Sequence, residues 1–65
     1  MEINKDNILE QLPSSKFVKI SYMVKALGIR DIKDARFLQI KLEELVKSRL
    51  IEKKKSEGKT WYKKK

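Results

Sequence analysis

The strongest pattern in the sequence is an apolar residue at every third or fourth position between residues 33 and 48. This spacing places the apolar side chains on one face of an α-helix. Leu38, Leu42 and Leu45 fall within about 60° of one another on that helix, at about 100° per residue. We therefore expect a long amphipathic helix that buries these leucines and exposes its opposite face.

A shorter helix is expected over residues 4–12. Asn4 is a residue type that caps helix N-termini well, and Pro13 cannot continue a helix, so both ends are marked. The apolar face of this helix consists of Ile8, Leu9 and Leu12.

Residues 22–27 predict a second, shorter helix. Ser21 is well suited to cap its N-terminus, and Gly28 suits the left-handed position that often follows a helix. Val24 and Leu27 are expected to face the core.

Two segments alternate between apolar and polar residues, which is typical of strands. Residues 16–20 predict a short strand or an extended link, with Phe17 and Ile20 facing inward. Residues 50–63 predict a two-stranded hairpin whose turn holds Gly58, a residue that readily adopts positive φ.

In the hairpin, Ile51 and Trp61 are the expected inward residues. A tryptophan in so small a protein is far more often part of the core than a platform for a ligand. The lysines are expected on the solvent side and at the tip of the hairpin. Residues 63–65 are expected to form a frayed tail.

The length and charge of the chain limit the number of domains and the kind of partner. The 65 residues leave room for one domain, which we expect to cover residues 1–65. The chain has 17 Lys and Arg against 9 Asp and Glu, a net charge of +8, and residues 52–65 alone hold seven lysines and two glutamates. Such an excess favours a polyanionic partner, although lysine-rich surfaces can also serve solubility alone.

The order of expected elements is helix, extended link, short helix, turn, long helix and hairpin, and it resembles the winged helix-turn-helix superfamily of small archaeal, viral and bacterial regulators. The segments that carry the resemblance are residues 26–29, residues 42–54, Gly58-Lys59 and Trp61-Tyr62. The resemblance implies an α+β fold, mainly α, with three helices and a C-terminal two-stranded wing. A third short strand at residues 16–20 is the alternative to an extended link.

The sequence departs from that superfamily at two places. The spacing from Gly28 to Leu42 is about one helical turn longer than in the common bacterial pattern, so either the turn is enlarged or the third helix begins early. Arg49 stands where a glycine is usual, so Arg49 or Ser48 must adopt a less favourable backbone conformation.

The resemblance also implies where nucleic acid would bind, with the long helix in a groove and the wing on the phosphates. The candidate residues of the recognition helix are Lys33, Arg36, Gln39, Ile40 and Lys47. The candidate residues of the wing are Lys53, Lys54, Lys55 and Lys59. Arg36 suits guanine and Gln39 suits adenine, each discriminating by about 1–3 kcal/mol. An ordinary solvated helix face explains any single one of them equally well.

We therefore expect binding of duplex DNA, favoured over RNA, by a small regulator of transcription or an architectural factor. One alternative is RNA binding, because residues 8–12, 27–30 and 42–51 are also similar to the winged-helix ribosomal protein of the archaeal and eukaryotic small subunit. Another is a homodimer or protein-interaction module that docks through Phe37 and Ile40, two large apolar residues outside the buried stripe.

The sequence gives little support to enzymes, metal-binding proteins or membrane proteins. Histidine, cysteine and a glycine-rich phosphate loop are missing, and the adjacent Glu43 and Glu44 diverge by about 100° on a helix. We thus expect no enzyme, no metal site and no cofactor. No apolar run approaches the length of a membrane span, and the N-terminus lacks a secretion signal. We expect the protein in the cytoplasm with the nucleoid, or in the nucleus, and neither secreted nor in a membrane.

Overall fold

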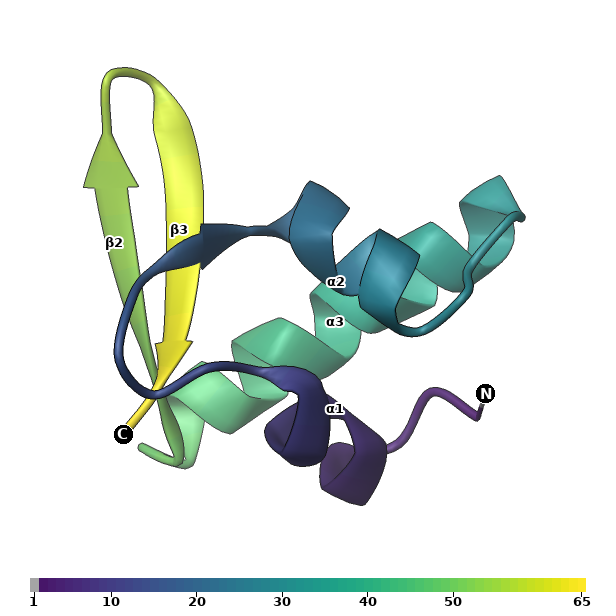
Figure 1. Cartoon of the computed structure of the whole chain (residues 1–65), viewed down its shortest axis with the longest axis horizontal. Helices are drawn as coiled ribbons and strands as arrows, with labels where there is room; N and C mark the ends of the chain where they lie inside the picture. Colours follow the sequence, from purple (N-terminus) through teal and green to yellow (C-terminus); the bar gives the residue numbers. More distant parts are fainter. Residues whose placement is uncertain (1) are drawn as a thin grey trace.

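The computed structural model describes residues 2–65, and in this part of the chain three helices pack against a three-stranded antiparallel sheet. The elements in chain order are α1 (Lys5–Gln11), β1 (Val18–Lys19), α2 (Ile20–Ala26), α3 (Ile32–Lys47), β2 (Ile51–Ser56) and β3 (Lys59–Lys64). The hairpin of β2 and β3 extends beyond the helices as a wing (Figure 1). This arrangement confirms the α+β winged-helix expectation, third strand included. No helix among residues 2–65 combines the length and apolar content needed to cross a membrane.

The sheet has the order β1-β3-β2, so β3 is its central strand. On one edge β3 pairs with β1, where Val18 lies opposite Tyr62 and Lys19 opposite Trp61. On the other edge it pairs with β2 along six residues. The two residues between the wing strands, Glu57 and Gly58, both have positive φ, at 54° and 74°. This is the geometry of a two-residue hairpin turn that matches the twist of the strands, and it confirms the role expected for Gly58.

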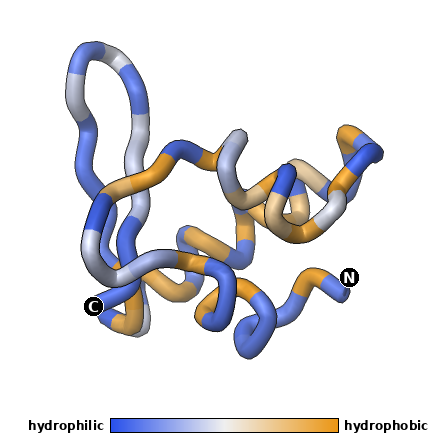
Figure 2. Tube along the Cα trace, in the orientation of Figure 1, coloured by the Kyte–Doolittle hydropathy of each residue, from blue (hydrophilic) through white to orange (hydrophobic). Residues whose placement is uncertain are grey.

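The core lies where the three helices meet the inner side of the sheet. Its buried residues are Ile8, Leu12, Val18, Met23, Leu27, Leu38, Leu42, Leu45, Ile51 and Tyr62. The three leucines of α3 are all buried, as the helical period predicted. Figure 2 shows apolar stretches in the segments that converge on this core, while the tip of the wing is polar.

The prediction for the inward face of the sheet was wrong by one residue in two strands. Tyr62 is the buried aromatic residue of β3 with 2% of its surface exposed, whereas Trp61 is only half-buried. In β1, Val18 is buried, and Phe17, just before the strand, is half-buried. Successive side chains of a strand point to opposite faces, so a shift of one position exchanges the two faces completely. Ile51 is buried as expected.

The second helix begins earlier than the sequence suggested. Its N-cap is Lys19, which makes no side-chain capping hydrogen bond, and Ser21 lies inside the helix. The early start follows from β1, which runs directly into α2, so strand pairing rather than a capping side chain fixes the helix start. Met23 is the fully buried residue of α2, while Val24 is partly buried against the core.

The helices α2 and α3 end in the same way. After α2, Gly28 has φ 67° and Ile29 donates its N–H to the carbonyl of Val24 at 2.9 Å. After α3, Arg49 has φ 62° and Leu50 donates to the carbonyl of Leu45 at 3.0 Å. A left-handed residue with such a backward hydrogen bond is a common helix end. Arg49 thus adopts the unfavourable conformation that the missing glycine predicted.

The position at which α3 begins explains why the spacing from Gly28 to Leu42 is longer than in the common bacterial pattern. The helix begins at Ile32, and the Asp31 carboxylate caps it by accepting a hydrogen bond from the N–H of Lys33 at 2.7 Å. The third helix therefore begins early, which is one of the two expectations.

The expected tail at residues 63–65 is largely part of the sheet, because Lys63 and Lys64 belong to β3. Lys64 donates its backbone N–H to the carbonyl of Pro13 and its Nζ to the carbonyl of Leu9, both at 2.9 Å. The end of α1 thus holds the end of β3 in place, a contact that no local pattern indicates.

Candidate nucleic-acid interface

The exposed side of α3 forms one wall of a shallow hollow. This hollow is lined by Arg36, Gln39, Ile40, Glu43, Glu44 and Lys47. Four of the five recognition-helix candidates therefore lie together, as their spacing on the helix predicted. Lys33 is exposed at the first turn of α3 but does not line the hollow.

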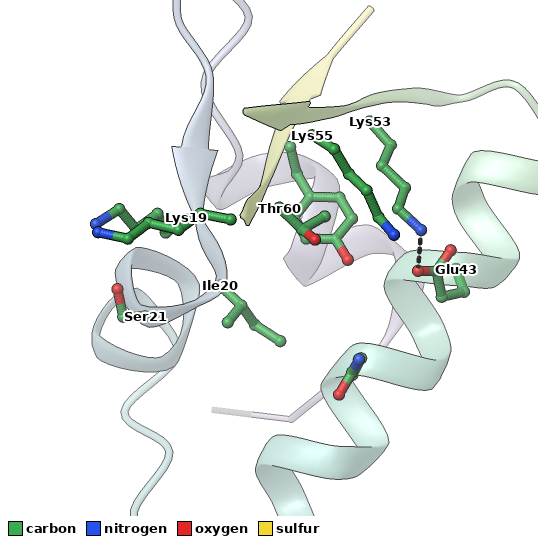
Figure 3. A pocket seen from close by; sticks show the side chains of 10 residues that line it. Lys19, Ile20, Ser21, Glu43, Lys53, Lys55 and Thr60 are labelled. Atoms are coloured by element: carbon green, nitrogen blue, oxygen red, sulfur yellow. Dashed lines mark hydrogen bonds and ion pairs between the residues drawn. The ribbon is translucent and has the colours of Figure 1, made fainter. Parts of the chain in front are cut away.

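A second hollow lies between α3 and the wing. Its walls come from α2, α3 and the sheet, through Lys19, Ile20, Ser21, Gln39, Glu43, Lys53, Lys55, Lys59, Thr60 and Tyr62. Gln39 and Glu43 belong to both hollows, so the two form one concave surface, which we call the inner face. In Figure 3, Lys53 and Lys55 extend from β2 toward α3 across this surface, and Lys19 points the other way.

The centre of the inner face contains a carboxylate. Glu43 accepts a hydrogen bond from the ammonium group of Lys53 at 2.7 Å, which the dashed line in Figure 3 marks. This hydrogen bond, together with the charge of Glu43, raises the pKa of Lys53 above its ordinary value. Lys53 therefore stays charged, but its charge is already paired. Glu44 is paired with Lys41 at 3.6 Å, one turn away on the same helix.

Other cations of the inner face have no such partner. Among residues 2–65, no carboxylate lies within 4 Å of the charged groups of Arg36, Lys47, Lys55 or Lys59. The neighbouring ammonium group of Lys59 lowers the pKa of Lys19 below its ordinary value. Like charges brought together without a carboxylate between them create a surface that attracts anions.

The wing lysines are divided between the two sides of the sheet, although we expected them to act together. Lys53 and Lys55 line the inner face, whereas Lys54 lies on the opposite side over the ring of Phe17. Lys59 borders the second hollow, but it lies on the side of Trp61, two residues along β3, next to Lys19. Alternation along β2 explains the division. Thr60 is an inner-face residue that sequence reasoning missed. Lys19 borders the second hollow but lies on the side of Trp61, and it was not predicted either. The alternation of residues 16–20 could have indicated Lys19 if its register had been known.

Phe37 and Ile40, the candidates for protein contact, are exposed to 43% and 57%. They lie in different hollows: Ile40 lies beside Arg36, and Phe37 lies beside Glu2, Ile3 and Asp34. Three residues apart on α3, the two side chains are neighbours on the helix surface but border different hollows. Among residues 2–65, no group of three or more Asp or Glu residues is arranged to hold a metal ion.

Comparison with known families identifies the relationship of this chain. The family described as cyanobacterial RNase R, N-terminal domain, matches residues 6–60. The chain belongs to this family. The match covers α1 from its second residue, α2, α3, β1, β2 and the first two residues of β3, so it includes most of the inner face. We expected a winged-helix regulator from the sequence. The fold agrees with that superfamily, and the family match is narrower, because it names the N-terminal domain of an RNase R. No curated protein matches the chain, and no solved structure matches it.

Proposed function

We propose that this chain is an RNA-binding domain of an RNase R and that its inner face holds the RNA. The family is named for the N-terminal domain of a ribonuclease, which favours RNA over the duplex DNA that we expected from the order of elements. The proposal gives the inner face the task of binding and assigns no cleavage to its residues.

The observation that carries the proposal is the pair of cationic walls around one concave surface. Arg36 and Lys47 come from α3, and Lys55 comes from the wing beside Lys53, whose charge is paired with Glu43. A nucleic-acid backbone bound between these walls would meet positive charge on both sides. Contacts of this kind provide affinity and orientation without reading sequence.

A change of target from DNA to RNA changes what α3 can do. The major groove of an RNA duplex is too deep and narrow for side chains to read, so α3 would not insert there as in a DNA complex. Arg36 and Gln39 would instead contact phosphates and 2′-hydroxyl groups along the wide minor groove. We therefore expect recognition of duplex RNA by shape and charge rather than by base sequence.

Binding should be tested with labelled 16-base-pair RNA, the DNA duplex of the same sequence and a single-stranded RNA, by fluorescence anisotropy. If the inner face makes about six phosphate contacts, the log-log salt slope on a duplex should be about −5. The double variant R36Q/K55Q should lose about tenfold or more in affinity for duplex RNA at low salt, because each lost phosphate contact weakens binding several-fold.

The matched control is K5Q/K65Q, which removes the same charge from exposed residues away from the inner face. Its affinity should remain within about twofold of the original chain. An equal loss in both double variants would show that only net charge matters and would contradict an inner-face site. Preferred binding to one DNA sequence would instead support a regulator of transcription. Absence of binding to any nucleic acid would support the third alternative, a protein-interaction module that docks through Phe37 and Ile40.

A further inference from the structure

The side of the sheet that faces away from the helices gathers aromatic and cationic side chains. Trp61 and Lys63 of β3, Lys54 of β2 and Lys19 of β1 share this side, which we call the outer face, with Phe17 at its edge. Glu52 of β2 also lies on this side, where its carboxylate pairs with Lys63 at 3.3 Å. The alternation of the strands fixes this grouping, because Val18, Ile51 and Tyr62 point the opposite way into the core. The outer face is thus the surface that the unexpected register exposes.

The aromatic rings of the outer face lie under lysine ammonium groups. Lys19 Nζ lies 5.2 Å from the centre of the Trp61 ring. Lys54 Nζ and Lys63 Nζ lie 4.7 Å and 5.3 Å from the centre of the Phe17 ring. Cations within about 6 Å of an aromatic ring are attracted to it, and at exposed sites this attraction is weak. A ligand that offers both a flat ring and a negative charge can therefore take the place of the ammonium group and also bind it.

Next to these rings, a hollow runs between the sheet and α2. It is lined by Lys16, Phe17, Val18, Lys19, Ser21, Tyr22, Lys25 and Trp61. Three of the five aromatic residues of the chain therefore surround it, together with three lysines. None of its lining residues carries a carboxylate, whereas the inner face contains Glu43 and Glu44.

We propose that the outer face is a second nucleic-acid site, which binds unpaired nucleotides by stacking their bases on Phe17 and Trp61 and by holding their phosphates with Lys16, Lys19 and Lys25. This goes beyond the proposed function, because a chain whose inner face bound no duplex could still take a single strand here. Aromatic rings next to a cationic groove are how proteins bind single strands without sequence preference.

The chemistry of this surface fits nucleotides better than an acidic peptide. An acidic peptide would use the lysines but would have no need of three aromatic side chains around one hollow. Every nucleobase has a π-face that can stack on an aromatic ring, and each base is followed by a phosphate. The crowding of Lys19 by Lys59, which lowers the pKa of Lys19, would also be relieved by a phosphate nearby.

Trp61 makes this proposal directly measurable, because it is the single tryptophan of the chain. We would titrate the whole chain with a 12-nucleotide oligouridylate, which forms no duplex, and follow tryptophan fluorescence and anisotropy. Stacking on Trp61 should quench its fluorescence as the strand binds. The variant F17L should weaken binding by about 5- to 100-fold, as expected for the loss of one stacked base.

The matched control is F37L. Phe37 also has a lysine over its ring, Lys41 at 5.5 Å, but it is more exposed than Phe17 and lies on α3 beside Asp34 and Glu2. F37L should leave binding of the oligouridylate within about twofold of the original chain. If circular dichroism shows that F17L does not fold, K16Q/K25Q replaces it, since both lysines are exposed. This variant should also weaken binding, by about tenfold.

Three outcomes would overturn the outer-face site. The first is binding of the strand without quenching of Trp61, and the second is an equal loss in F17L and F37L. The third is displacement of the strand by polyglutamate or by inorganic polyphosphate at equal charge concentration, since neither has a base to stack. The inner-face variant R36Q/K55Q separates the two sites: it should lose duplex RNA and still show quenching with the single strand. If R36Q/K55Q lost both duplex binding and the quenching by the single strand, the two faces would not be independent sites.

Discussion

The two sides of β3 differ both in burial and in the side chains around them. Tyr62 points to the helices and is buried in the core, whereas Trp61, its neighbour in sequence, is only half-buried on the outer face. The inner face combines cations with two glutamates, and the outer hollow combines cations with aromatic rings and no carboxylate. Two positively charged surfaces can thus suit different forms of a nucleic acid, because the groups between the lysines differ.

The largest expected effect is on the free energy of unfolding, and it compares the loss of Tyr62 with the loss of Trp61. Tyr62→Ala should reduce the free energy of unfolding by about 3–5 kcal/mol, because it empties a large buried site. Trp61→Ala should cost less, since part of that side chain is already in water. Urea denaturation followed by circular dichroism would measure both values without using the tryptophan as a probe.

Equal losses in the two variants would show that Trp61 is as much a core residue as Tyr62. The division of β3 into a structural side and a binding side would then fail. Tyr62→Phe and Trp61→Phe give the same comparison with smaller changes if either alanine variant does not fold.

A smaller effect is expected from the carboxylate at the centre of the inner face. Glu43→Gln removes a negative charge and releases Lys53, whose ammonium group lies 2.7 Å from that carboxylate. Affinity for duplex RNA should increase by about two- to fivefold at low salt, and this gain should disappear as salt screens the charges. Binding of the oligouridylate to the outer face should not change.

Glu10→Gln is the control, because it makes the same change in net charge at an exposed position of α1. If Glu10→Gln strengthens duplex binding as much as Glu43→Gln does, the effect is one of total charge and the inner face has no special role. If Glu43→Gln weakens binding, the ion pair with Lys53 positions the wing.

The smallest expected effect concerns alkaline pH. Burial is the main cause that raises the pKa of Tyr62 above 10.0, and the nearby Glu43 raises it further. A raised pKa in the folded state means that the stability from this group is complete below about pH 10 and is lost as the pH rises through the folded pKa. Thermal melting between pH 8 and 11 should show a shallower alkaline loss in Tyr62→Phe than in the original chain.

Tyr22→Phe provides the comparison on the outer side, since Tyr22 is 43% exposed and lines the outer hollow. Its alkaline loss of stability should match that of the original chain. An identical alkaline curve for Tyr62→Phe would mean that the buried hydroxyl does not contribute to the pH dependence.

Much of this molecule could be predicted because the signals were local. The leucine stripe of α3, the cap at Asn4, the turn at Gly58 and the strained Arg49 all depend on residues a few positions apart. The clustering of Arg36, Gln39, Ile40 and Lys47 followed from the period of one helix. The distribution of the wing lysines could not be predicted in this way, because it depends on which side of β2 faces the helices.

The sequence by itself determined the set of elements, their order and the position of the positive charge, since helical period, capping and turn chemistry act within a few residues. Only the tertiary structure decided that Tyr62 rather than Trp61, and Val18 rather than Phe17, face the core. Two adjacent aromatic residues satisfy an alternating pattern in either register, so the pattern does not choose between them. The pairing of β1 with β3 and the packing of both against the helices make that choice, and they thereby create the outer face.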